Sequence, residues 1–217
     1  MTSAAEPARD CRLCPRLAAF RDANRVAYPS FFNAPVPIFG DAGARLLIVG
    51  LAPGLKGANA TGRPFTGDYA GDLLYETLLD YGFARGVYGA RPDDGMTLVQ
   101  TRIVNAVRCV PPQNKPTPLE ARTCRSFLAA AIAQTQRLTA IVTLGRVAHD
   151  NALRTLGARA AQAPFVHGAR ADLHVEGRSV ALLSSYHCSR YNTNTGVLTR
   201  DMFRAVFARA RAILDAT

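Results

Sequence analysis

The chain has 217 residues, and its 26 Lys and Arg, all but two of them Arg, outnumber 16 Asp and Glu to give a formal net charge of +10. Hydrophobic residues make up 48% and charged residues 19%, which excludes a disordered chain and is enough for one sizeable core. Five cysteines are too few for a disulfide-dense secreted scaffold. No apolar run approaches the roughly 20 residues that span a bilayer, and the N-terminus has no apolar signal-peptide core. We therefore expect one soluble domain over residues 1–217, monomeric and cytoplasmic.

The basic excess has two interpretations. Lys and Arg side chains that neutralise phosphates release condensed counterions, which favours a nucleic-acid partner. Alternatively, a chain that is rich in Ala and Arg throughout reflects a compositional habit of its source. Charge alone favours nucleic acid only weakly.

Strands and helices alternate along the sequence. In chain order, the apolar patterns predict a buried strand at 46–49, a helix around 73–81, a strand at 98–107, a helix from about 117, a strand at 140–144, a helix at 146–156, a strand at 180–184 and a helix at 199–214. This order predicts an α/β fold with a central, mostly parallel four-stranded sheet flanked by helices on both faces.

Three loops with unusual composition follow predicted strands. They cover residues 50–68, 105–109 and 184–196. In parallel sheets, ligands bind at the loops that leave the carboxyl ends of the strands. The first loop is rich in glycine, yet it matches neither the P-loop nor the dinucleotide-binding fingerprint. Its glycines allow a close approach of the backbone to a ligand.

Four of the five cysteines have a spacing that metal sites use. Cys11 and Cys14 form a C-x2-C pair, while Cys109 and Cys124 lie far downstream. Structural zinc usually takes two tight pairs, whereas a four-cysteine iron–sulfur cluster tolerates looser spacing because each thiolate reaches one corner. Spacing alone leaves a cluster, zinc and ordinary buried cysteines open.

The three loops together resemble the uracil-DNA glycosylase superfamily and, within it, the iron–sulfur type-B branch called family five. The matching segments are G-L-A-P-G from Gly50, G-x-N-x-T-G-R-x-F-T-G-D ending at Asp68, N-x-V-x-C-x-P-P from Asn105, and H-x-S-R-x-N-T-x-T-G from His187. The resemblance implies a small parallel sheet flanked by helices. It also implies a 4Fe-4S cluster whose ligands are Cys11, Cys14, Cys109 and Cys124, tying the N-terminal segment to the domain.

The resemblance assigns roles around an extruded base. Phe65 matches the position that stacks on the base. Asn105 matches the carboxamide that reads uracil, and His187 matches the donor to the charge that develops on O2 of the leaving base. The backbone of Gly50, Ala52 and Gly54 is expected to line the same site.

The group that handles water is less directly indicated. Related branches carry an acidic residue at the position of Leu51, which is apolar here. Asp68 is the nearest carboxylate and our candidate for ordering water or stabilising the cationic sugar. The competing interpretation of Asp68 is a cap on the helix that starts near Tyr69. Asn59 is a second candidate for holding the water.

Contacts with DNA are expected from residues inside or beside the three loops. One side chain of the His187 loop, Arg190 or Tyr191, is expected to fill the gap left by the flipped nucleotide. We place Arg63, Arg108 and Arg190 on phosphates, and the residues expected to contact DNA are Arg63, Ser189, Arg190, Tyr191 and Asn192.

These features predict a monofunctional DNA glycosylase that removes uracil in base-excision repair, with other deaminated bases as further substrates and DNA in the nucleoid as partner. A Schiff-base lyase mechanism is disfavoured because Lys56 is the only lysine in the three loops. The alternatives are a non-catalytic iron–sulfur DNA-binding protein and an electron-transfer protein.

Overall fold

The computed structural model describes residues 6–175 and 177–217. A five-stranded sheet lies at its centre, in the order β4-β1-β5-β7-β6. The strands are β1 (Leu46–Gly50), β4 (Thr101–Asn105), β5 (Ala140–Leu144), β6 (Arg170–Val175) and β7 (Arg178–Ser185). The first four in spatial order are parallel, and β6 runs antiparallel to β7. The predicted α/β class is confirmed, with one strand more than expected.

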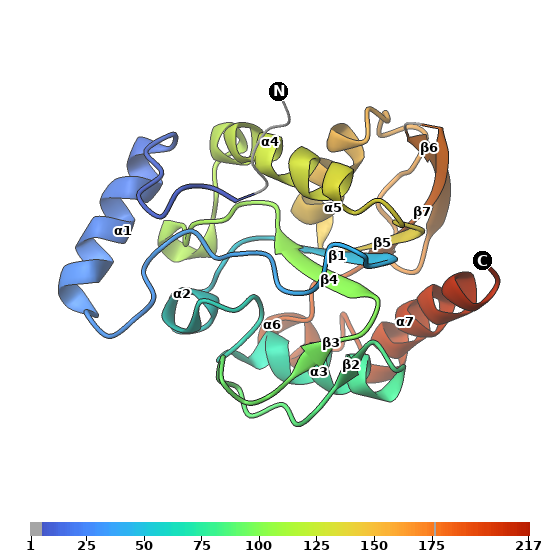
Figure 1. Cartoon of the computed structure of the whole chain (residues 1–217), viewed down its shortest axis with the longest axis horizontal. Helices are drawn as coiled ribbons and strands as arrows, with labels where there is room; N and C mark the ends of the chain where they lie inside the picture. The colour runs from blue at the N-terminus through green and yellow to red at the C-terminus, as the bar shows by residue number, and fades with distance from the viewer. Residues whose placement is uncertain (1–5, 176) are drawn as a thin grey trace.

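Helices cover both faces of this sheet (Figure 1). One face packs on α3 (Tyr69–Asp80) and α7 (Arg200–Asp215), and the other on α4 (Pro118–Gln134) and α5 (Arg146–Thr155). Alternate residues of β1 divide between the two cores: Leu46 and Ile48 face α3 and α7, and Leu47 and Val49 face α4. No described helix is long and apolar enough to cross a membrane.

Two departures from the predicted strands have local causes. The predicted strand at 98–107 is broken at Gln100, whose φ is +52°. Its first part, β3 (Thr97–Leu98), pairs with β2 (Ala84–Arg85) in a separate two-stranded sheet. The missed strand β6 lies at the sheet edge and exposes charged side chains, so it lacks the apolar run that marks the buried strands.

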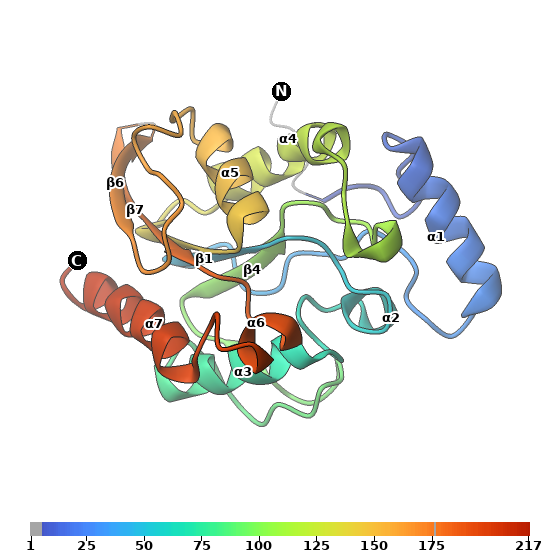
Figure 2. The ribbon, with the colours of Figure 1, turned by 180° about the vertical axis from the view of Figure 1, so that it is seen from behind.

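The N-terminal segment contains a helix that the apolar pattern does not predict, α1 (Pro15–Ala27). It lies at one end of the molecule, and the C-terminus lies at the other (Figures 1 and 2). Its buried face includes Arg21 and Asn24 beside Leu17 and Ala18. Because two residues of the buried face are polar, the apolar residues of this segment do not show the spacing that marks a helix. Three short helices complete the elements: α2 (Ala58–Thr61), α6 (Arg190–Asn194) and the 3-10 turn η1 (Pro112–Asn114).

A buried ion pair anchors the loop that follows β1. The Arg63 guanidinium binds both carboxylate oxygens of Asp94, at 2.7 and 2.6 Å, and the two side chains are 5% and 3% exposed. The guanidinium also lies 5.2 to 5.9 Å from the ring centroids of Phe39, Tyr75 and Tyr88, a cation–π arrangement. Hydrogen bonds from Arg63 hold the pKa of Asp94 well below its ordinary value.

Two of the arginines predicted to contact phosphates are therefore buried. Arg63 is occupied by Asp94. Arg108 is 1% exposed, donates from Nε to the Val36 carbonyl oxygen at 2.7 Å and pairs with Glu6. The prediction that these two side chains bind DNA phosphates is wrong, because each is held inside the protein by acceptors of its own.

The ion pair makes a testable contribution to stability. Asp94→Asn leaves the Arg63 charge buried without its carboxylate, so we expect the free energy of unfolding in urea at pH 7 to fall by about 3 to 5 kcal/mol. Because folding lowers the pKa of Asp94, this difference should shrink as pH falls below about 4.

The matched control is Asp93→Asn. Asp93 pairs with Arg91 at 3.4 Å, but both side chains are exposed, so the expected change is below about 1 kcal/mol. Equal losses in the two variants would contradict the special role of the buried pair.

Candidate active site

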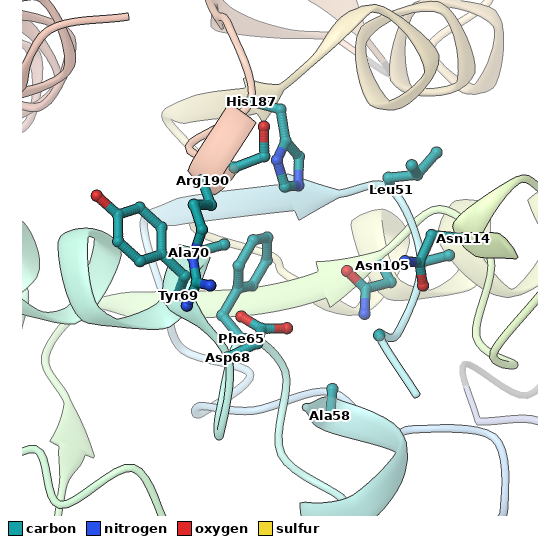
Figure 3. A pocket seen from close by; sticks show the side chains of 13 residues that line it. Leu51, Ala58, Phe65, Asp68, Tyr69, Ala70, Asn105, Asn114, His187 and Arg190 are labelled. Atoms are coloured by element: carbon teal, nitrogen blue, oxygen red, sulfur yellow. The ribbon is translucent and has the colours of Figure 1, made fainter. Parts of the chain in front are cut away.

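A cavity of about 410 Å³ opens where β1, β4 and β7 end, a size typical of small-molecule sites. It collects residues from all three loops singled out in the sequence. Figure 3 shows Phe65, Asp68, Asn105 and His187 around the same space. The lining residues are Leu51, Ala52, Gly54, Ala58, Phe65, Asp68, Tyr69, Ala70, Asn105, Asn114, His187, Ser189 and Arg190.

The base of the site forms where the last residues of β1 and β4 pair. Gly50 lies opposite Asn105 in the parallel register. A Cβ atom at Gly50 would lie 2.4 Å from Asn105 Oδ1 and 2.6 Å from the Phe65 ring. Glycine at this position therefore lets the carboxamide and the ring approach each other beside the backbone. The Asn105 side chain lines the cavity.

Phe65 is held in an unusual backbone conformation. Its φ is +52°, a region that costs a non-glycine residue energy. The hydroxyl of Tyr75 donates to the Pro64 carbonyl oxygen at 2.7 Å, and that of Tyr88 donates to the Phe65 carbonyl oxygen at 3.2 Å. Both tyrosines also flank Arg63. The Arg63 cluster thus supports the turn that presents the Phe65 ring to the cavity.

Asp68 caps the helix α3 and also lines the cavity. As N-cap of α3 it accepts a hydrogen bond from the Gly71 N–H at Oδ1, 3.3 Å away. Its other oxygen, Oδ2, lies beside the backbone of Gly54 and Gly57, where a Cβ atom would be 3.1 and 2.3 Å away. Burial raises the pKa of this carboxyl, which makes it a better proton acceptor.

His187 faces Phe65 across the cavity, with ring centroids 6.1 Å apart. Burial lowers the pKa of His187 to about 4, so the imidazole is neutral at pH 7. Its backbone carbonyl accepts a hydrogen bond from Asn192 Nδ2 at 2.8 Å. The preceding Tyr186 N–H donates to His167 Nδ1 at 3.1 Å, and His167 Nε2 lies 3.2 Å from the Met202 carbonyl oxygen. The loop is thereby fixed on both sides of His187.

The rest of the His187 loop lies at the mouth of the cavity. Ser189 caps α6 by accepting the Asn192 N–H at 3.4 Å. The Arg190 guanidinium stacks on Tyr69, 5.2 Å from its ring centroid. Tyr191 is 73% exposed. Arg190 is exposed as well, so both residues considered for filling a duplex lie at the surface.

Asn59 does not line the cavity. It is 1% exposed, and its Nδ2 donates to Asn33 Oδ1 at 2.9 Å. The neighbouring Ala58 faces the cavity instead, because successive residues of a helix point in different directions. The structure therefore brings Asp68, and not Asn59, to the cavity.

Sequence reasoning missed four lining residues: Ala58, Tyr69, Ala70 and Asn114. Asn114 is exposed and has φ +56°, a conformation that Asn tolerates better than most residues. The Pro-Pro-Gln-Asn run ahead of Lys115 marks a turn, and it is the one signal that could have placed Asn114 beside the site.

The four cysteines of the predicted metal site line a separate small hollow between α1 and α4. Cys11, Cys14, Cys109 and Cys124 are free thiols, and the Arg108 backbone N–H donates to Cys124 Sγ at 3.4 Å. Within residues 6–175 and 177–217, no three His, Cys, Asp or Glu side chains are placed to hold a single metal ion.

Comparisons with known proteins agree with this geometry. The family model of the uracil DNA glycosylase superfamily matches residues 37–211. A type-5 uracil-DNA glycosylase of Thermus thermophilus is 43% identical over 94% of this chain and 93% of its own length. The corresponding values are 41%, 94% and 78% for the Mycobacterium tuberculosis protein of that name, and 38%, 94% and 88% for that of Pyrobaculum aerophilum. The chain therefore belongs to the uracil-DNA glycosylase superfamily and, within it, to the type-5 family.

Proposed function

We propose that this protein is a monofunctional DNA glycosylase that removes uracil from DNA, with other deaminated bases as further substrates. The observation that carries the proposal is the convergence of Phe65, Asn105, His187 and Asp68 on one cavity of small-molecule size. We further propose that it acts as a monomer in the cytoplasm, on nucleoid DNA.

The base side of the cavity matches an extruded pyrimidine. The Phe65 ring offers a flat apolar surface for stacking. The Asn105 carboxamide has both a donor and an acceptor, which complement O4 and N3–H of uracil. Cytosine presents the opposite pattern at these two positions, so the same carboxamide orientation would face it with unpaired groups.

Bond breaking separates charge between base and sugar. The bonding pair of the C1′–N1 bond leaves with the base, and negative charge spreads onto O2. The neutral His187 ring donates a hydrogen bond to O2, and this bond strengthens as the charge develops. Asp68 faces the sugar side, where its carboxylate stabilises the cationic sugar and takes a proton from the water whose oxygen bonds to C1′.

DNA contacts are assigned to the His187 loop and the rim of the cavity. Arg190 reaches phosphate from its position over Tyr69, with Ser189 and Asn192 shaping the loop. The exposed Tyr191 fills the space of the flipped nucleotide.

We also propose that Cys11, Cys14, Cys109 and Cys124 hold a 4Fe-4S cluster. All four line one hollow, and a cluster offers each thiolate its own iron. Next to these cysteines, buried Arg21 has two nitrogen atoms, Nε and Nη2, without a hydrogen-bond partner, which fits an anionic group in the hollow. When bound, the cluster supplies a cross-link between the N-terminal segment and the sheet.

The first test measures uracil release and the part that His187 plays in it. Wild-type protein should convert a uracil-containing duplex to abasic sites in the presence of EDTA. His187→Ala should lower single-turnover release by on the order of 100-fold, with duplex affinity little changed. Because the pKa of His187 is about 4, we expect no inflection in the rate near pH 6.5 and a midpoint near 4 when the ring is titrated by NMR.

His174→Ala is the control, since His174 is exposed on β6 and its loss should leave the rate unchanged. Intact uracil DNA under varied salt and pairing would favour the alternative, a non-catalytic DNA-binding protein. The same holds if His187→Ala and wild type show equal rates.

A second test separates the two roles of Asp68. Asn caps helices about as well as Asp, so Asp68→Asn should keep the free energy of unfolding within about 0.5 kcal/mol of wild type. Loss of the proton acceptor should lower single-turnover uracil release by about 10² to 10⁴-fold. An unchanged rate would reduce Asp68 to a helix cap.

A third test concerns the cysteines. Cys109→Ser should lose iron, inorganic sulfide and the brown colour of the protein, and should lower its melting temperature. Cys188→Ala serves as control: Cys188 is buried beside Ala70, away from the hollow, so this variant should retain iron. Colourless wild-type protein containing zinc would refute the cluster.

A further inference from the structure

Arg21 is the most unusual charged residue in the N-terminal segment. It lies on α1 and is 1% exposed. Nη1 donates to the Cys11 carbonyl oxygen at 3.0 Å, but Nε and Nη2 are buried without a hydrogen-bond partner. Burying guanidinium N–H groups without acceptors is costly, so an acceptor is expected within their reach.

The carboxylates nearby do not meet this need. Arg21 Nε lies 3.8 Å from Asp22 Oδ1, beyond hydrogen-bond distance. Asp22 also pairs with Arg12 at 2.6 Å and with Arg25 at 3.5 Å. Asp10 pairs with Arg25 at 2.7 Å. Three guanidinium groups thus share two carboxylates, which leaves one more positive charge than negative charge. The guanidinium that has no carboxylate within hydrogen-bond distance is the buried one, that of Arg21.

The other neighbour of Arg21 is the cysteine hollow. Leu17 and Ala18, on the same buried face of α1, line it. Arg21 itself donates to the backbone of Cys11, which is one of the cysteines that line the hollow. The guanidinium therefore lies beside the segment that carries a proposed cluster ligand.

We propose that Arg21 is a cluster-supporting residue, a buried cation that hydrogen-bonds to sulfur of the anionic 4Fe-4S cluster and slows its loss. The inference rests on the cluster proposed above and extends it to a residue outside the four ligands. Groups that contact metal ligands from outside commonly change metal retention by 10- to 100-fold. A buried positive charge also stabilises the more negative, reduced form of a cluster.

The opposite outcome is physically well defined. If the hollow holds only neutral thiols, replacing a buried, partly unpaired cation by an apolar side chain of similar length should leave the protein as stable or more stable. The effect of Arg21→Met on stability therefore has opposite signs with and without a cluster, which makes this variant the informative one.

The experiment uses the full chain purified without oxygen. Iron and sulfide content are measured first, then the rate at which visible absorbance is lost in EDTA under air, and then the reduction potential. Arg21→Met should lose absorbance at least about tenfold faster than wild type and have a more negative potential. Arg21→Lys keeps the charge without the planar fork and should fall between the two, which preserves the test if the Met variant fails to fold.

Arg12→Met is the matched control. This variant removes a positively charged partner of the same carboxylate, Asp22. Because the Arg12 side chain is 64% exposed, cluster retention should equal that of wild type. Wild-type retention and potential in both Arg21 variants would overturn the proposal. Wild-type protein without iron and sulfide would overturn the cluster itself. Uracil release has no part in these readouts, so failure of the proposed glycosylase activity is seen separately.

Discussion

The active site depends on one close approach, at the carboxyl end of β1. Gly50 is paired with Asn105 in the parallel register, and the Asn105 carboxamide and the Phe65 ring occupy the space that a Cβ atom would need. The Phe65 ring and the Asn105 carboxamide are thus set side by side where β1 and β4 pair. Asp68 repeats the arrangement against Gly54 and Gly57. Side chains crowd against bare backbone here, so the geometry tolerates little change at these glycines.

Buried arginines stabilise the fold, whereas only exposed arginines are available to bind DNA. Arg63 anchors the Phe65 turn, Arg108 binds the Val36 carbonyl oxygen and Glu6, and Arg21 donates to the Cys11 carbonyl oxygen. All three are buried. A net charge of +10 therefore overstates what is available to DNA. Arginine suits these buried positions because its planar guanidinium binds several acceptors and stacks on aromatic rings. Exposed Arg190 remains at the mouth of the cavity.

The predictable parts of the structure were those marked by apolar runs or by motifs. The buried strands 46–49 and 140–144 lie within β1 and β5, and the motif residues Phe65, Asn105 and His187 meet in one cavity. The roles predicted from the sequence differ from the structure where polar side chains are buried and bind other protein groups. Arg63 and Asn59 stand in a functional motif, yet Asp94 and Asn33, distant in sequence, decide their roles. A motif identifies the residues, but tertiary partners decide which of them face the ligand.

The N-terminal segment connects the cysteine hollow to the active site. Leu17 of α1 packs with Val107 and Ala121 in a small apolar cluster that also contacts Ala52, and Ala52 lines the cavity. A second connection joins α1 to α2 through Asn33. The Nδ2 of Asn33 donates to backbone carbonyl oxygens at the end of α1, and its Oδ1 accepts a hydrogen bond from Asn59 of α2. A third connection is the Arg16 guanidinium of α1, which binds both carboxylate oxygens of Glu120 on α4 at 2.8 Å. The proposed four-cysteine cross-link would add to these connections and so hold the Ala52 wall of the cavity in place.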